Sequence, residues 1–206
     1  MKKILKYFLI LILLAWVYLL WYIYAGSMFI PPHYHANFAV YQWDKKIDFS
    51  DDTYMEDVSA CSLTGEIAPK DRAHLHENNG DTIHIHADGV AWGHFFWNIG
   101  YIISSDFIKT DASEILVASE ENTINFMLNG KKVSEIHNRL IRSKDRLLVA
   151  YWNYSEDELS DLFETVSQNA WEYNSKYDPG SCWGTNENGI IVMLRDLMHW
   201  LHSEWH

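Results

Sequence analysis

Histidine is the residue type whose spacing first suggests chemistry in this sequence. Six of the eleven histidines fall into three H-x-H units, in which two histidines flank a single residue. In a β-strand, residues i and i+2 point to the same face and are separated by about 6.6 Å of rise, so one unit can aim two imidazoles at one ion. We therefore take as candidate metal ligands His33, His35, His74, His76, His84 and His86.

The loop between the second and third units decides whether their histidines share a face. A two-residue turn at Asn79-Gly80 would put the two pairs on opposite faces. A three-residue loop over 78–80, with Gly80 in the left-handed conformation and a bulge, would instead place His74 opposite His84. That register also turns towards the core the apolar residues Leu75, Ile83 and Ile85. We therefore expect four imidazoles on one exposed sheet face, with the first unit joining them from an adjacent strand.

An all-imidazole site favours copper(II) or zinc among the metals that bind nitrogen ligands. Glu77, Asp81 and Asp88 are close in sequence and could orient the imidazoles, or one of them could ligate the ion directly. His94 is a possible further ligand, although a lone histidine on a helix is also typical of the surface. The alternative to a metal site is a polar sheet face on which histidine is simply tolerated.

The two cysteines, Cys61 and Cys182, could form one disulfide that closes a long loop. A metal thiolate or two free buried thiols are the alternatives. Three further histidines, at positions 199, 202 and 206, line one face of a predicted last helix, which suggests packing or a membrane surface more than a second metal site.

The N-terminal segment has the features of a membrane anchor. Residues 7–26 contain no charge over twenty positions, which is about the length that a helix needs to cross a bilayer. Lys2, Lys3 and Lys6 precede this stretch, so the positive-inside rule predicts a cytoplasmic N-terminus and an extracytoplasmic remainder. A cleavable signal peptide is the competing interpretation, because 25–27 are small residues.

The net charge of the chain argues against one class of partner and favours another. The formal charge of -12 leaves no basic surface for a nucleic-acid backbone, and nucleic-acid binding is set aside. With the three anchor lysines left out, thirteen of the sixteen basic residues remain against all twenty-eight acidic ones. The predicted exterior therefore attracts cations, although a solvated acidic surface would have the same composition.

The hydrophobic periodicity beyond the anchor predicts an α+β fold. We expect a hairpin over 37–47 that turns at Asp44-Lys45, a mostly irregular segment over 48–70, and a second hairpin over 73–87. A short helix over 90–99, capped by Asp88, should follow. Further strands are expected over 123–128 and 147–152, with a turn at 129–130.

Two helices are predicted at the C-terminal end. Ser155 and Glu158 form an S-x-x-E capping box, which opens a helix that could run to about residue 175. A final helix is expected from about residue 190. The whole chain is thus predicted as a cytoplasmic tip, anchor and linker (1–32), a His-rich α+β exterior domain (33–153) and a C-terminal helical extension (154–206).

The block from His33 to Trp152 contains HYHANF, HLHENNGDTIHIHADG, an aromatic helix with Phe95-Phe96, and the closing DRLL sequence. It resembles a group of uncharacterised membrane-anchored His-rich proteins predicted in microbial genomes. This resemblance carries over no catalytic residue. The order hairpin, short helix, strand with an Asn-Gly turn, and closing strand is also similar to the ubiquitin-like β-grasp arrangement.

Three classes of function remain open. The first is an extracytoplasmic protein that binds copper or zinc for acquisition, buffering or delivery. The second is a metalloenzyme, either an oxidase or oxygenase or a zinc hydrolase, in which an open coordination position holds water. The third is an accessory subunit whose aromatic surface contacts a membrane-protein partner. The H-x-H units favour the first.

Overall fold

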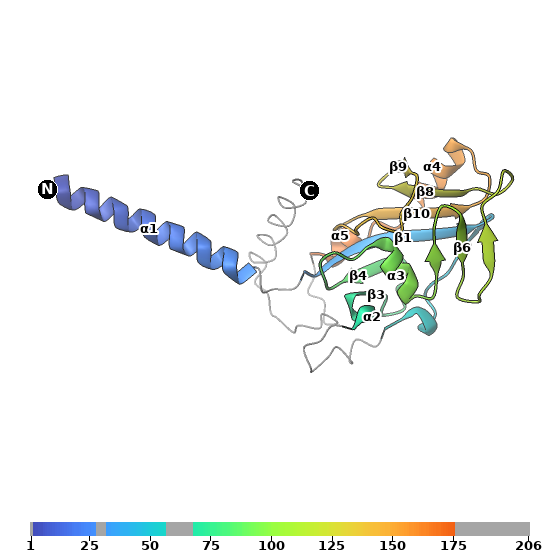
Figure 1. Ribbon diagram of the computed structural model, residues 1–206, viewed down its shortest axis with the longest axis horizontal. Helices are drawn as coiled ribbons and strands as arrows, with labels where there is room; N and C mark the ends of the chain where they lie inside the picture. Colours follow the sequence, from blue (N-terminus) through green and yellow to red (C-terminus); the bar gives the residue numbers. More distant parts are fainter. Residues whose placement is uncertain (1, 28–31, 57–67, 176–206) are drawn as a thin grey trace. The chain divides into compact units, whose positions relative to one another are not determined.

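The computed structural model describes residues 2–27, 32–56 and 68–175. The chain divides into two compact units, one containing the N-terminal segment and the other beginning at Pro32. The first unit contains the helix α1 (Lys2–Ser27; Figure 1). Its stretch Ile4–Tyr22 is long and apolar enough to cross a membrane and is not buried, and a signal sequence would meet the same criteria. The predicted apolar N-terminal helix is therefore confirmed.

A mixed sheet forms the centre of the second unit (Figure 1). Its central strands β1 (Tyr34–Gln42) and β10 (Arg146–Tyr151) run parallel, and the other strand pairs of this sheet in the described residues are antiparallel. The strand order is β3, β4, β1, β10, β8, β9, and β2 pairs with β1. The remaining strands are β2 (Lys45–Lys46), β3 (Ala73–His74), β4 (Thr82–Ile85), β8 (Ile124–Leu128) and β9 (Lys131–Val133). The α+β class is thus confirmed.

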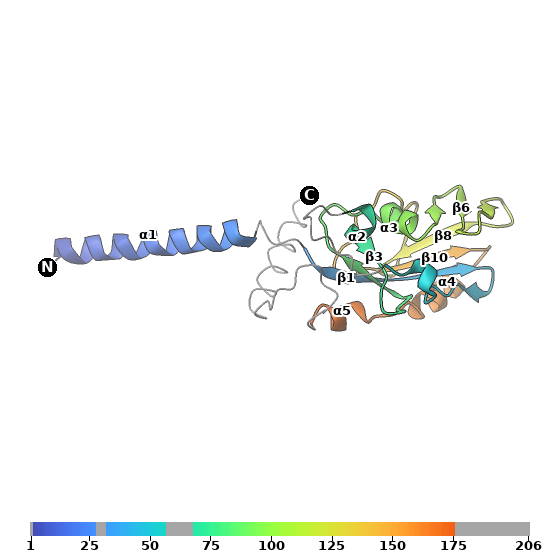
Figure 2. The ribbon, with the colours of Figure 1, turned by 90° about the horizontal axis from the view of Figure 1, so that it is seen from below.

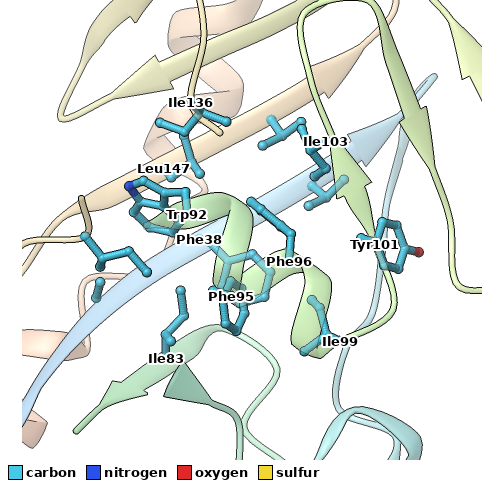
Figure 3. Close-up of a cluster of buried hydrophobic side chains, with 14 of the residues drawn as sticks. Phe38, Ile83, Trp92, Phe95, Phe96, Ile99, Tyr101, Ile103, Ile136 and Leu147 are labelled. Atoms are coloured by element: carbon cyan, nitrogen blue, oxygen red, sulfur yellow. The ribbon is translucent and has the colours of Figure 1, made fainter. Parts of the chain in front are cut away.

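One face of this sheet packs against α3 (Trp92–Asn98) and carries the larger hydrophobic core (Figure 3). The ring of Phe38 on β1 lies 4.9 Å from the ring of Phe95 and 5.9 Å from that of Phe96. Asn98 donates a hydrogen bond to the backbone oxygen of Ala73 at 2.8 Å, which fixes the end of α3 to β3. Nearly every residue of β1 is buried, as expected for a central strand covered on both faces.

The helices α4 (Glu156–Glu164) and α5 (Ala170–Tyr173) lie on the opposite side of the sheet from α3 (Figure 2). The predicted capping box is confirmed: the Ser155 hydroxyl accepts the Glu158 N–H, and the Glu158 carboxylate accepts the Ser155 N–H. A second apolar cluster lies beneath α4 and comprises Ala39, Tyr41, Leu148, Ala150, Leu159, Phe163 and Val166. The expectation of one helix to about residue 175 is wrong, because the intervening 165–169 (TVSQN) contain poor helix formers.

A small antiparallel sheet was not predicted. It consists of β5 (Ile102–Ile103), β6 (Phe107–Lys109) and β7 (Ile115–Val117). Ile108 and Leu116 are buried and join the larger core. Strands of two or three residues are too short for an alternating pattern to stand out from the sequence.

The turns and short helices give mixed outcomes. The predicted turn between β8 and β9 is confirmed, since Asn129 (φ 52°) and Gly130 (φ 76°) both have the left-handed conformation that such a turn requires. The first hairpin turns at Trp43 (φ 56°) and the following residue, one position earlier than expected. Asp88 does not cap α3, whose N-cap residue is Ala91. In the described part of the segment 48–70, η1 (Asp52–Tyr54) is a short helix and α2 (Pro69–Arg72) begins.

Candidate metal centre

Three neighbouring strands carry the three H-x-H units. β1 and β4 pair with His35 opposite His84, and β3 and β4 pair with His74 opposite His84. His84 therefore lies in the middle of a row of three histidines, as the hairpin register predicted. The other three histidines lie at positions 33, 76 and 86, beside the ends of the same strands. We refer to the six as the histidine array.

Strand alternation separates the imidazoles from the apolar residues between them. Leu75, Ile83 and Ile85 are fully buried in the larger core, as predicted. The histidines are also buried: exposure is at most 3% for His35, His74, His76, His84 and His86, and intermediate for His33. The expectation of an exposed face is therefore wrong, because α5 packs on β1 at this end of the sheet.

The loop between β3 and β4 reaches the predicted register by a different conformation. Positive φ angles occur at Glu77 (58°) and Asn78 (54°), and not at Gly80. Gly80 is needed for space instead, since a Cβ atom there would lie 2.6 Å from the backbone carbon of Phe49 and 2.6 Å from the backbone nitrogen of Ser50. Gly80 is therefore required in this loop, but the predicted reason, a left-handed conformation, is wrong.

His84 Nδ1 lies close to two other ring nitrogens of the array. His84 Nδ1 lies 2.9 Å from His35 Nε2 and 2.8 Å from His76 Nε2. A ring nitrogen carries either one hydrogen or one lone pair, so His84 Nδ1 cannot form a full hydrogen bond to both neighbours at once. Two nitrogens that each bind one ion at about 2.0–2.1 Å lie about 2.9–3.4 Å apart when the nitrogen–metal–nitrogen angle is between those of square-planar and tetrahedral geometry. The observed separations are close to this range.

The remaining imidazoles stack next to these. The rings of His33 and His86 are 4.7 Å apart with planes 12° from parallel, and those of His74 and His86 are 5.0 Å apart at 17°. His74 Nδ1 also lies 3.3 Å from the backbone oxygen of Lys70. His86 is thus the middle ring of a stack that includes His33 and His74.

One subset of the array could hold a metal ion. His33, His35 and His84 each offer a ring nitrogen, and the three nitrogens lie within 4.8 Å of one another. Neutral imidazole nitrogen is a common ligand of zinc, copper, nickel and iron. The short contact from His76 to His84 adds a fourth imidazole beside this group.

The residues at the end of α5 contact the array directly. The Asn174 side-chain oxygen accepts the backbone N–H of His35 at 2.9 Å and lies 2.7 Å from His35 Nδ1. The Tyr173 ring is 5.5 Å from the ring of His35 and 5.8 Å from that of His84, and its hydroxyl accepts a hydrogen bond from Asn79. Tyr173 and Asn174 could not be identified from the sequence, because the contact of Asn174 with His35 spans 139 residues and leaves no local pattern.

The predicted carboxylates lie at the edge of the array or beyond it. The Glu77 carboxylate is 4.0 Å from His76 Nδ1, and its side chain is 62% exposed. Asp81 forms an ion pair with Lys46 at 3.0 Å. Asp88 lies in the turn that precedes α3. Glu77 is thus a carboxylate that lies within 4.0 Å of an array imidazole.

The other candidates are placed elsewhere or are not described. His94 is on α3, and its Nε2 lies 2.9 Å from the backbone oxygen of Pro69, so its observed contact is with α2. Cys61 and Cys182 lie outside the described residues, as does the helix predicted from residue 190. The disulfide therefore remains a prediction.

Burial favours neutral groups around this end of β1. Tyr34, between the two histidines of the first unit, donates its hydroxyl hydrogen to the backbone oxygen of Ile141, and burial raises its pKa far above the usual value. Burial also raises the pKa of Asp145, although hydrogen bonds from the Asn129 side chain and the Arg142 backbone oppose the shift. A cation bound near β1 would lose most of its hydration shell. Its ligands would therefore have to replace the water molecules that it gives up.

Comparison with protein-family models, curated proteins and solved structures finds no match to this chain. The function must therefore be argued from the geometry of the array.

Proposed function

We propose that this protein is a membrane-anchored protein that holds a copper or zinc ion on the histidine array, for metal acquisition, buffering or delivery. The observation that carries the proposal is that His33, His35 and His84 each offer a ring nitrogen and that these three nitrogens lie within 4.8 Å of one another. The short contacts of His84 Nδ1 with His35 Nε2, at 2.9 Å, and with His76 Nε2, at 2.8 Å, support it.

Proton placement explains why a cation suits this point. If His84 Nδ1 carries the hydrogen, that hydrogen must be shared between two neighbouring nitrogens. If His84 Nδ1 carries a lone pair, it faces the lone pair of any neighbouring nitrogen that also lacks a hydrogen, and the two repel each other. A metal ion removes the conflict between two facing nitrogens, because both can then direct lone pairs at it.

Ligand number and burial favour holding the ion over catalysis. With His76, which lies beside the group His33, His35 and His84, four imidazoles would surround the ion. A closed set of four protein ligands is typical of structural or storage sites, whereas catalytic zinc keeps a position open for water. The donors are imidazoles, which suit copper(II) and zinc. Their burial favours slow exchange of the ion with solvent.

The location of the array belongs to the same proposal. The α1 helix would anchor the protein, with the lysines before it in the cytoplasm and the sheet domain outside. The acidic composition beyond the anchor would raise the local concentration of cations near the site. A membrane-protein partner would be the recipient or donor of the ion.

The β-grasp arrangement and the resemblance to membrane-anchored His-rich proteins are further parts of the proposal. The strand order β4, β1, β10, β8, β9, with β1 and β10 parallel at the centre and α3 between β4 and β8 in sequence, supports a β-grasp core. In this view the array occupies the edge where β3 extends that core.

Metal analysis tests the proposal. The full chain in detergent is stripped with a chelator, dialysed against copper(II) or zinc, and its bound metal is measured by elemental analysis. We expect at least one equivalent in the wild type, a more than about tenfold loss in His84→Ala, and no loss in the matched variant His94→Ala, whose imidazole contacts Pro69. Equal metal content in wild type and His84→Ala would refute the proposal.

A further inference from the structure

The side-chain oxygen of Asn174 is fixed as a hydrogen-bond acceptor. A backbone N–H can only donate, and that of His35 points at Asn174 Oδ1 at 2.9 Å. The amide nitrogen of the same side chain donates to the Ser143 hydroxyl oxygen at 3.0 Å. The orientation of the amide group is thus set by one unambiguous donor and one matching acceptor.

The same oxygen determines which nitrogen of His35 carries the hydrogen. His35 Nδ1 lies 2.7 Å from Asn174 Oδ1, and an acceptor can be approached this closely only by an N–H. In a neutral imidazole the other nitrogen, Nε2, then has a lone pair. His35 Nε2 is the atom that lies 2.9 Å from His84 Nδ1, at the centre of the array.

We infer that Asn174 is a positioning residue, which keeps the hydrogen of His35 on Nδ1 and so makes Nε2 the atom that binds metal. The metal-binding part of this inference rests on the proposed function, whereas the hydrogen placement does not. Metal-binding histidines usually donate their second ring N–H to a carbonyl or carboxylate oxygen, which fixes the ring and makes it a better ligand.

The segment that carries Asn174 is itself held in place. The backbone N–H of Ala170, at the start of α5, donates to the Asn37 side-chain oxygen at 2.9 Å. Tyr173 accepts a hydrogen bond from Asn79 in the loop between β3 and β4. Asn174 is therefore presented by a segment tied to two parts of the sheet that carries the histidines.

Two substitutions test the role. Asn174→Ala removes the acceptor, whereas Asn174→Asp keeps an oxygen for both the backbone N–H and Nδ1–H of His35. Asn98→Ala is the matched control, because Asn98 also links two segments through its side chain but contacts the backbone of Pro69 and Ala73. Each full-length protein is prepared in detergent with ¹⁵N-labelled histidine, first without metal.

Nitrogen NMR then shows which ring nitrogen of His35 carries the hydrogen. The His35 signals are assigned by comparison with a His35→Gln variant. We expect Nδ1–H to predominate in the wild type, in Asn174→Asp and in Asn98→Ala, and to lose its dominance in Asn174→Ala. A wild-type His35 with its hydrogen on Nε2, or an unchanged His35 in Asn174→Ala, would overturn the inference.

Copper(II) and zinc titrations of the same proteins complete the test. Asn174→Ala should bind more weakly by about 10–100-fold, as is typical when a histidine ligand loses its second partner, and Asn174→Asp should restore binding. Unchanged affinity in Asn174→Ala would overturn the metal-binding part of the inference. Failure of the wild type to bind either ion would instead refute the proposed function and leave the NMR result standing.

Discussion

The sheet face opposite α3 has two halves that differ in chemistry. Beneath α4, the strands β1 and β10 present apolar residues such as Tyr41 and Leu148 to Leu159 and Phe163. Towards α5, the same face presents the histidine array, of which all members but His33 are buried. Burying apolar surface stabilises a fold, whereas burying imidazoles costs free energy unless their nitrogens find partners. The comparison supports the proposal that the first half maintains the fold and the second half binds metal.

Asn37 lies at the junction between these halves. Its amide nitrogen donates to the backbone oxygen of Asp81 and to the Thr82 hydroxyl, both at 3.0 Å, and its side-chain oxygen accepts the N–H of Ala170. One side chain thus joins β1, β4 and α5. These hydrogen bonds tie α5 to two of the strands that carry the array.

Truncation of the apolar half should have the largest effect on stability. Leu148 is fully buried, and Leu148→Ala should lower the free energy of unfolding by about 2–5 kcal/mol, because it removes packed atoms and leaves a cavity. Chemical denaturation measures the change. Metal content per folded chain should equal that of the wild type, and a loss of bound metal would break the distinction between the halves.

Metal should stabilise the protein through the other half alone. At a free metal concentration of about 100 times Kd, binding should raise the free energy of unfolding by about 2.7 kcal/mol. His35→Ala should abolish this gain, since His35 belongs to the group that could hold the ion. Denaturation curves with and without metal test the prediction. An equal gain in the wild type and in His35→Ala would contradict it.

Acid should remove the metal-dependent gain. Imidazoles must be deprotonated to bind metal, so the gain is present at higher pH and is lost as pH falls and protons compete with the ion. We expect the gain measured at about pH 7.5 to be largely absent at about pH 5.5. The stability difference between wild type and Leu148→Ala should change little over this range. A metal-dependent gain that is independent of pH would argue against imidazole ligands.

The smallest effect is expected at the start of α4. Ser155→Ala removes the hydroxyl that accepts the Glu158 N–H, and loss of such a cap costs about 1 kcal/mol. Metal affinity should not change, because α4 packs over the apolar half. Calorimetry and metal titration on the same sample check both statements, and weaker metal binding would show that the two halves are coupled.

Much of the site could be predicted because its determinants are local. Residues at i and i+2 share a face of a strand, so the three H-x-H units predicted three pairs of imidazoles, each pair on one face of its strand. The burial of Leu75 and Ile85 selected the register that places His74 opposite His84. The capping box at Ser155 and the turn at Asn129 depend on short-range chemistry in the same way.

The cover of the site could not be predicted, because it depends on distant segments. The break between α4 and α5 brings Asn174 to His35, and no property of the residues near either position specifies that contact. Burial of the histidines depends on the same long-range packing. Because no local pattern reveals this packing, the sequence predicted an exposed face. Gly80 was assigned to a left-handed turn because its close approach to Phe49 depends on another part of the fold.

X-ray absorption spectroscopy at the metal edge of the copper- or zinc-loaded full chain tests the central claim most directly. Imidazoles from three strands should produce a shell of three or four nitrogens at about 2.0–2.1 Å with the outer-shell scattering of histidine rings, and His84→Ala should lose it. A shell containing sulfur at about 2.3 Å, or one without imidazole scattering, would contradict the account.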